Sequence, residues 1–111
     1  MIGADAIRGH IDLIVLAILE PGPSYPYEIA KTLTEQSGGD YVIKQTTLYT
    51  AVKRLESQQL LDSYEGVSTS GKPRTYYRIT PEGREQLMAK RIEWQRTREL
   101  VDHFAKGRTQ P

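Results

Sequence analysis

The apolar positions in the N-terminal part of the chain predict two helices. Residues 6–20 are apolar on almost every side, which is typical of a buried helix, and Pro21 ends this helix. After the turn PGP, the hydroxyl of Ser24 can cap a second helix, and Pro26 is tolerated in its first turn. We expect the second helix to end near the sequence SGGD at 37–40.

A third predicted helix, residues 46–61, has an apolar face and an unusual polar face. At about 100° per residue, the side that faces the core consists of Leu48, Val52, Leu55 and Gln59. The opposite side has no carboxylate and carries Thr46, Thr47, Tyr49, Thr50, Lys53, Arg54 and Ser57. A solvated helix face usually mixes charges of both signs, so this composition predicts that a partner lies against it. Thr46 and Thr47 are both candidates for the N-cap.

After Leu61 the apolar positions repeat every second residue, which indicates a β-hairpin. Its strands are residues 60–67 and 74–80, and the turn-prone sequence STSGKP separates them. Alternation along the second strand predicts a core side and a basic side, which consist of Thr75, Tyr77 and Ile79 and of Arg74, Tyr76 and Arg78. A β-prone triplet at 41–43 predicts one further short strand.

The last predicted helix starts with the pair Thr80 and Pro81, a capping residue followed by proline at the first helical position, and runs to about residue 104. It contains a heptad-like seam that is formed by Leu87, Trp94, Thr97, Val101 and Phe104. Met88 and Ile92 lie on a different side. We expect one side to pack on the helix's own domain and the other on a second copy of the chain. The alternative is that both sides are core of one chain.

The order of these elements is helix, helix, short strand, helix, hairpin and long helix, which is the order of a winged helix-turn-helix. The predicted fold class is therefore α+β, mostly α. We expect residues 1–80 to form a winged-helix DNA-binding domain and residues 81–106 to form a C-terminal dimerisation helix. Residues 107–111 are expected to be a flexible tail.

Composition limits the class of protein. With 111 residues the chain forms one domain with a modest core, to which a second subunit adds useful burial. Cysteine is absent, which excludes disulfides and thiolate metal sites and suits a reducing cytoplasm. The longest apolar run, residues 14–19, is shorter than the roughly 20 residues of a membrane span, and the first residues lack the pattern of a signal peptide. We expect a soluble, cytoplasmic protein without a membrane segment.

Candidate catalytic and metal-binding residues are few. His10 and His103 have no second imidazole at ligand spacing, and no G-x-S-x-G or similar context activates a serine. We therefore expect neither an enzyme nor a bound metal or cofactor.

The net charge is only +1, but the charge is unevenly spread. Residues 1–40 contain two basic and six acidic residues. In contrast, residues 41–55 and 66–80 each contain three basic residues and no acidic residue. Two acid-free basic segments favour binding of a polyanion, even in a nearly neutral protein.

The third helix and the hairpin together indicate a surface for double-stranded DNA. A B-DNA major groove, about 12 Å wide, accepts one helix whose exposed side is slim and positive. A basic hairpin loop can reach the adjacent backbone or minor groove. The residues expected at DNA are Thr46, Thr50 and Lys53 near base edges, Lys44, Tyr49 and Arg54 on phosphates with Thr47 beside them, Lys72 and Arg74 at the tip of the hairpin, and Tyr76 on its second strand.

The strings SYPYEIAKTL, TLYTAVKRLESQQLL and RTYYRITPEG resemble the PadR family of bacterial transcriptional regulators, over roughly residues 7–104. The combination of TLYTAVKRLE with RTYYRITPEG is the most specific part. The resemblance implies a homodimer built by the C-terminal helix, a palindromic operator, and often repression relieved by a small aromatic or amphipathic ligand. It also implies a cavity for planar aromatic compounds beside Trp94, to which we assign Ile11 and Val15. Pro26 and Gln59 depart from the family pattern, because glycine is usual at both positions.

Some of these residues have a second interpretation. Tyr49 and Tyr77 are both compatible with a place in the core, which is what we expect for Tyr77. Lys53 and Arg54 are also compatible with an ordinary solvated helix face. Trp94 also suits a plain interface without a cavity. For the whole protein, the alternative function is a winged-helix module for protein–protein contact without DNA specificity.

Overall fold

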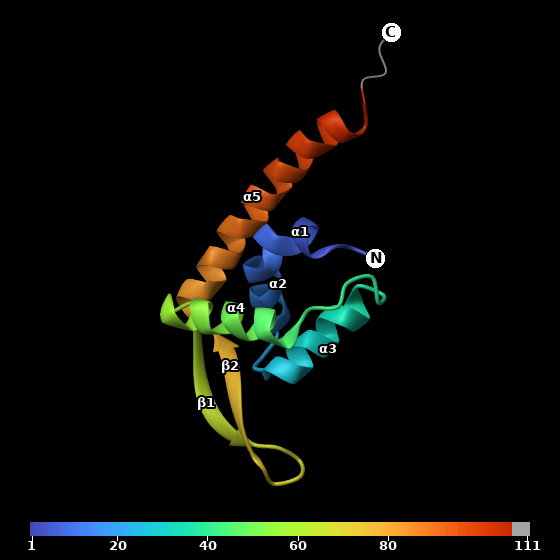
Figure 1. Cartoon of the computed structure of the whole chain (residues 1–111). Helices are drawn as coiled ribbons and strands as arrows, with labels where there is room; N and C mark the ends of the chain where they lie inside the picture. The colour runs from blue at the N-terminus through green and yellow to red at the C-terminus, as the bar shows by residue number, and fades with distance from the viewer. Residues whose placement is uncertain (108–111) are drawn as a thin grey trace.

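The chain forms a winged helix-turn-helix with a long C-terminal helix (Figure 1). The computed structural model describes residues 1–107. Its elements are α1 (Ala4–Ile7), η1 (Arg8–His10), α2 (Ile11–Leu19), α3 (Pro26–Gln36), α4 (Gln45–Ser57), β1 (Leu61–Val67), β2 (Pro73–Ile79) and α5 (Pro81–Ala105). The predicted fold class is confirmed. The tail expected at 107–111 lies, apart from Gly107, outside the described residues.

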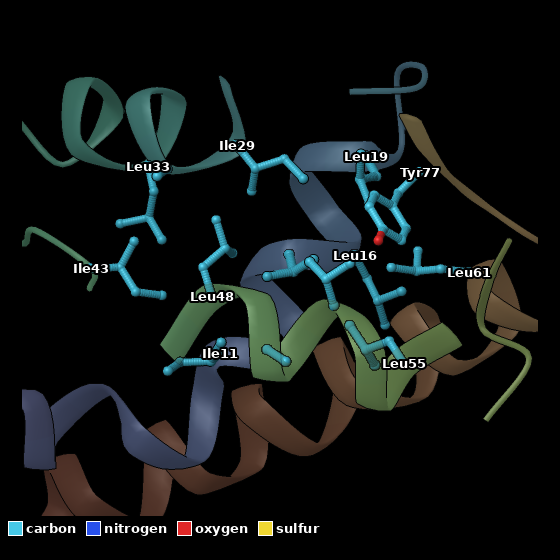
Figure 2. Packing of buried hydrophobic residues seen from close by; sticks show 14 of the residues in the cluster. Ile11, Leu16, Leu19, Ile29, Leu33, Ile43, Leu48, Leu55, Leu61 and Tyr77 are labelled. Atoms are coloured by element: carbon cyan, nitrogen blue, oxygen red, sulfur yellow. The ribbon is translucent and has the colours of Figure 1, made fainter. Parts of the chain in front are cut away.

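Buried side chains from the helices and from the hairpin meet in one core (Figure 2). The strands β1 and β2 and the loop between them, residues 68–72, are called the wing below. Leu48 and Leu55 point from α4 into the core, and neither has any exposed surface. Tyr77 of the wing is 1% exposed, so its predicted place in the core is confirmed. Each such burial contributes about 1.5 to 3 kcal/mol, and together they hold α4 against the wing and the other helices.

The first predicted helix is interrupted. The pattern predicts one helix over residues 6–20, whereas the structure has α1, the 3-10 turn η1 and then α2. Gly9 lies in this turn, and glycine is a poor helix former. His10 leaves helical geometry, with φ −121° and ψ 1°, and marks the start of α2. The prediction of a single helix is therefore wrong.

The third strand-like segment lies before α3 and not at residues 41–43. Ser24 forms an isolated antiparallel bridge with Tyr77, in which each backbone N–H donates to the other residue's carbonyl, at 3.0 and 2.7 Å. Ser24 therefore does not cap α3: Tyr25 takes the N-cap position, and the Ser24 hydroxyl donates to the Glu28 carboxylate at 2.6 Å. Residues 41–43 form no strand.

α4 begins and ends earlier than its apolar pattern predicts. Lys44 is its N-cap residue and makes no side-chain capping bond, so the prediction of a threonine cap is wrong. α4 ends at Ser57, and Gln59 is exposed instead of facing the core. Gln59 has a φ of 64°, the left-handed conformation that ends many helices. The N–H of Leu60 donates to the carbonyl of Leu55 at 2.9 Å, which closes a Schellman motif.

α5 starts as predicted and then extends away from the winged domain (Figure 1). The Thr80 hydroxyl oxygen accepts a hydrogen bond from the N–H of Gly83 at 2.9 Å. Farther along α5, Arg91 donates to both carboxylate oxygens of Glu20, at 2.9 and 3.3 Å. This hydrogen bonding, together with the charge of Arg91, lowers the pKa of Glu20. The ion pair between Arg91 and Glu20 anchors α5 on the end of α2.

Candidate nucleic-acid interface

The exposed side of α4 is built from small polar side chains and one cation. We call Thr46, Thr50, Lys53 and Ser57 the threonine face; all four are exposed. The Thr50 hydroxyl donates to the carbonyl oxygen of Thr46 at 2.8 Å, and the Ser57 hydroxyl donates to that of Arg54 at 2.7 Å. These bonds fold the hydroxyls back against the helix. The face therefore stays slim, and its hydroxyl oxygens keep lone pairs toward the outside.

Lys53 lies on the side of the threonine face that is nearest the wing. Its Nζ atom lies 5.5 Å from the ring centroid of Tyr49 and 5.9 Å from that of Tyr77. Hydrogen bonding to the Tyr77 hydroxyl is the main cause that raises the pKa of Lys53. Tyr49 is 50% exposed and is therefore not a core residue.

One carboxylate lies next to Lys53, at the edge of the threonine face. Glu56 is at the flank of α4 beside the wing, and its carboxylate is 3.6 Å from the Lys53 amine. The same carboxylate accepts a hydrogen bond from the Ser63 hydroxyl of β1 at 2.5 Å. Glu56 therefore ties α4 to the wing, while the threonine face itself carries no acid.

Arg54 lies on the opposite flank of α4, and its guanidinium pairs with the carboxylate of Asp12 on α2. A shallow pocket of about 330 Å³ separates this flank from η1. Its lining residues are Arg8, Ile11, Thr46, Thr47, Thr50, Ala51 and Arg54. Arg8 thus lies beside the threonine face. No sequence pattern indicates this position of Arg8, because η1 and α4 are far apart in the sequence.

On the wing, Lys72 is exposed in the loop, but Arg74 is not at the tip. Its guanidinium carbon lies 3.7 Å from the ring centroid of Tyr25, at the start of α3. Tyr76, on the same side of β2, is half-buried and lies next to both of them. No local sequence pattern indicates that Tyr25 contacts Arg74 and Tyr76, because α3 and β2 are far apart in the sequence.

The predicted seam of α5 divides between core and surface. Leu87 is only 1% exposed because its own chain covers it, so the prediction of Leu87 as an interface residue is wrong. Heptad spacing groups Leu87 with the exposed residues of α5, because spacing alone does not show at which residue the helix leaves its domain. Beyond that point, large apolar side chains are exposed, namely Ile92, Trp94, Leu100, Val101 and Phe104, and Thr97 is half-buried among them.

Within residues 1–107 of one copy, the pocket beside Trp94 is lined by neither Ile11 nor Val15. Its ring packs edge-on against His10 at a centroid distance of 4.8 Å, and the pocket beside it measures only about 70 Å³. Val15 has no exposed surface and Ile11 is 8% exposed, because both pack in the core of their own chain. The assignment of these two residues to an effector site is therefore wrong.

A larger apolar pocket, of about 410 Å³, lies between α2 and α3. The sequence shows it only as an excess of apolar residues on the first helix. The side chains that give it its apolar character are Ile2, Ile7, Leu13, Ile14, Ala17, Ile18, Pro21 and Leu33. Within residues 1–107, no helix has the length and apolarity needed to cross a membrane.

Comparisons with known proteins agree with this geometry. A solved transcriptional regulator from Clostridium thermocellum is 45% identical, with a TM-score of 0.86 over 94% of this chain and 98% of that chain. A PadR family regulator from Eggerthella lenta is 34% identical, with a TM-score of 0.82 over 94% of this chain and 88% of that chain. An uncharacterized protein from Lysinibacillus sphaericus is 36% identical over 96% of this chain and 98% of its own length.

The model of one protein family covers most of the winged domain and the start of α5. This model, the transcriptional regulator PadR-like family, matches residues 15–89, which include α3, α4 and both strands of the wing. The matched range also contains the strings SYPYEIAKTL, TLYTAVKRLESQQLL and RTYYRITPEG. The chain therefore belongs to the PadR-like family of DNA-binding transcriptional regulators.

Proposed function

We propose that the chain is a sequence-specific, homodimeric repressor whose α4 enters the major groove of a palindromic operator. The observation that carries this proposal is the threonine face, an exposed and acid-free helix surface beside a basic wing. A slim face lets the backbone of α4 approach base edges, while flanking cations hold phosphates. The proposed contacts are Thr46, Thr50 and Lys53 with bases and Lys44, Thr47, Tyr49, Arg54, Lys72, Arg74 and Tyr76 with the DNA backbone.

In this proposal, two parts of the chain have different functions. Residues 1–80 bind DNA, and residues 81–106 join two copies of the chain. The exposed apolar side chains of α5 support a dimer, because a helix in water does not keep so many large apolar groups uncovered without a partner. The apolar pocket between α2 and α3 gives a second copy a further surface to cover.

Two-fold symmetry links this dimer to the operator. Two copies of α4 that are about 34 to 36 Å apart meet successive major grooves on one side of the duplex. A palindromic sequence then offers each α4 the same half-site. Binding of chromosomal DNA also assigns the protein to the cytoplasm.

We propose Trp94 as the residue that an effector contacts. It is 40% exposed on α5, among side chains that a second copy is expected to cover. A planar aromatic or amphipathic compound stacked on its ring between two copies would change their relative angle. Such a ligand favours a separation of the two α4 helices that no longer matches the operator, which releases the repressor.

The test is selection of bound fragments from random double-stranded DNA. We expect recovered sites to contain an inverted repeat, and we expect affinity to fall with salt at a log–log slope of about −0.9 for each phosphate contact. A module used only for protein–protein contact would select no sequence and would show little salt dependence. Selected sites without any inverted repeat would contradict the dimeric part of the proposal.

A further inference from the structure

Aromatic and basic side chains form a continuous row on the outer side of the wing. The Tyr25 and Tyr76 rings meet edge-to-face at a centroid distance of 5.7 Å, and Tyr76 stacks on Tyr64 at 5.5 Å with an interplanar angle of 12°. Arg74 lies on Tyr25 at 3.7 Å, and Arg78 lies over Tyr64 at 5.0 Å. The row therefore connects the start of α3 with the whole outer side of the wing.

The chain builds this row through strand pairing. Tyr64 pairs with Tyr76 and Gly66 pairs with Arg74, so all four lie on one side of the hairpin. A Cβ atom at Gly66 would lie 2.6 Å from Cε1 of Tyr76, so only glycine leaves room for this ring. The bridge between Ser24 and Tyr77 keeps the next residue, Tyr25, beside β2.

Arg74 differs from the other wing arginine in its partners. Arg78 donates to the Asp62 carboxylate at 2.7 Å, whereas Arg74 forms no ion pair within the described residues. Its one polar contact there is a long hydrogen bond, 3.5 Å, to the Tyr76 hydroxyl. Contact with the face of the Tyr25 ring restrains the guanidinium, and the N–H groups that make no hydrogen bond stay available for an anion with two oxygens.

We infer that Tyr25 is a positioning residue, which holds the Arg74 guanidinium in place for a phosphate of the DNA backbone. An arginine that is already oriented loses less side-chain freedom when it binds, so the stacked ring strengthens the phosphate contact. The same contact braces the wing against the start of α3, the helix that lies beside the DNA backbone in helix-turn-helix proteins. This inference rests on the proposed DNA binding.

The test measures affinity for the selected DNA across a range of salt concentrations in five variants, namely Tyr25→Phe, Tyr25→Leu, Arg74→Ala, the double variant Tyr25→Leu, Arg74→Ala, and Arg96→Ala. Tyr25→Phe keeps the ring and should bind within about twofold of the unchanged chain. Tyr25→Leu loses the stacking and should bind roughly two- to tenfold more weakly, with a salt slope reduced by up to about one unit. In an Arg74→Ala background, Tyr25→Leu should have no further effect, because the two residues act as one unit. Arg96→Ala removes one positive charge from α5 and should leave the slope unchanged.

One further variant, Arg74→Lys, keeps the inference testable if Tyr25→Leu does not fold. Arg74→Lys preserves the charge but not the planar stacking, so it should weaken binding like Tyr25→Leu. Full affinity of Arg74→Lys, or additive effects of Tyr25→Leu and Arg74→Ala, would overturn the inference. Equal weakening by Tyr25→Phe and Tyr25→Leu would overturn it as well, since the hydroxyl would then be the important group. If the unchanged chain binds no DNA, the proposed function itself fails. If the unchanged chain binds DNA but the variants give one of the contrary results above, only the inference about Tyr25 fails.

Discussion

Arg54 on α4 and Asp12 on α2 form an ion pair that ties the helix proposed to enter the groove to the helix behind it. Both side chains are partly exposed, 44% and 24%, and exposed pairs contribute only about 0.2 to 1 kcal/mol. The pair therefore orients Arg54 more than it stabilises the fold. A phosphate that approaches α4 therefore competes with Asp12 for the Arg54 guanidinium.

Substitutions on either side of this pair distinguish the two roles of Arg54. We expect Asp12→Asn to leave DNA affinity unchanged or higher, because it frees the guanidinium and removes a negative charge near the phosphates. Arg54→Ala should weaken binding and reduce the salt slope by about one unit. Titrations of both variants at several salt concentrations check this. If both variants lose the same affinity, the pair acts through the position of α4 alone.

Lys53 is expected to contribute to sequence recognition. It is the one cation of the threonine face, and hydrogen bonding to the Tyr77 hydroxyl raises the pKa of Lys53 further above its ordinary value. Lys53→Ala should cost about 1 to 3 kcal/mol in specific binding and much less on unrelated DNA. Competition between operator and random DNA measures the difference. A folded Thr50→Ala, Lys53→Ala double variant that binds the operator at full strength would exclude α4 from base contact.

Gln59 stores backbone strain that a single substitution can remove. Its φ of 64° is unfavourable for any residue with a Cβ atom by roughly 1 to 2 kcal/mol, whereas glycine is free of this cost. Gln59→Gly should therefore raise the free energy of unfolding by about 0.5 to 1 kcal/mol after the extra entropy of glycine is subtracted. Thermal unfolding at fixed protein concentration measures it.

The neighbouring residue provides a matched control for this prediction. Gln58 has an ordinary φ of −87°, so Gln58→Gly relieves no strain and should lower stability by about 0.5 to 1 kcal/mol. Equal destabilisation by both substitutions would show that Gln59 is not strained.

Local patterns predicted much of this architecture, because each depends on residues close in sequence. Alternation along β2 placed Tyr77 in the core, and the pair Thr80 and Pro81 marked the start of α5. Helical periodicity alone also predicts that one exposed side of α4 has no acidic residue. These features need only the geometry of one helix or strand.

Local conformation at Gly9, Lys44 and Gln59 explains the corrected helix boundaries, whereas the other wrong predictions concern places where two distant segments meet. The bridge from Ser24 to Tyr77, and the stacking of Arg74 on Tyr25, depend on how α3 packs beside the wing, which no local pattern reports. Leu87 looked like part of an exposed seam, but whether α2 or solvent covers it depends on where α5 leaves the domain. Val15 is buried because α2 packs in the centre of the core, which the apolar pattern of one helix does not show.

Lys72 should hold the DNA backbone without reading its sequence. It is exposed in the wing loop and, within the described residues, forms no ion pair. Lys72→Ala should weaken specific and random DNA about equally and reduce the salt slope by about one unit. A changed base preference with an unchanged slope would show that the loop reads bases.

Phe104 tests whether α5 joins two copies of the chain. It is 70% exposed, and burial of such a ring contributes about 1.5 to 3 kcal/mol, which a two-fold dimer gains twice. Phe104→Asp should therefore shift the protein toward monomer in sedimentation and weaken operator binding, since two half-sites are no longer held by one particle. Phe104→Leu, which stays apolar, should keep the dimer. A fully monomeric unchanged chain would exclude this interface.

Trp94 is the only tryptophan of the chain, so its fluorescence reports directly on the proposed effector site. A planar aromatic compound that stacks on it between two copies should quench this fluorescence and, at the same concentrations, weaken operator binding. Stacking adds roughly 0.5 to 1.5 kcal/mol beyond area burial, so Trp94→Leu should lower ligand affinity about 2- to 13-fold while the dimer persists. Compounds that neither quench Trp94 nor change operator affinity would leave it as a plain interface residue and would remove ligand release from the proposed function.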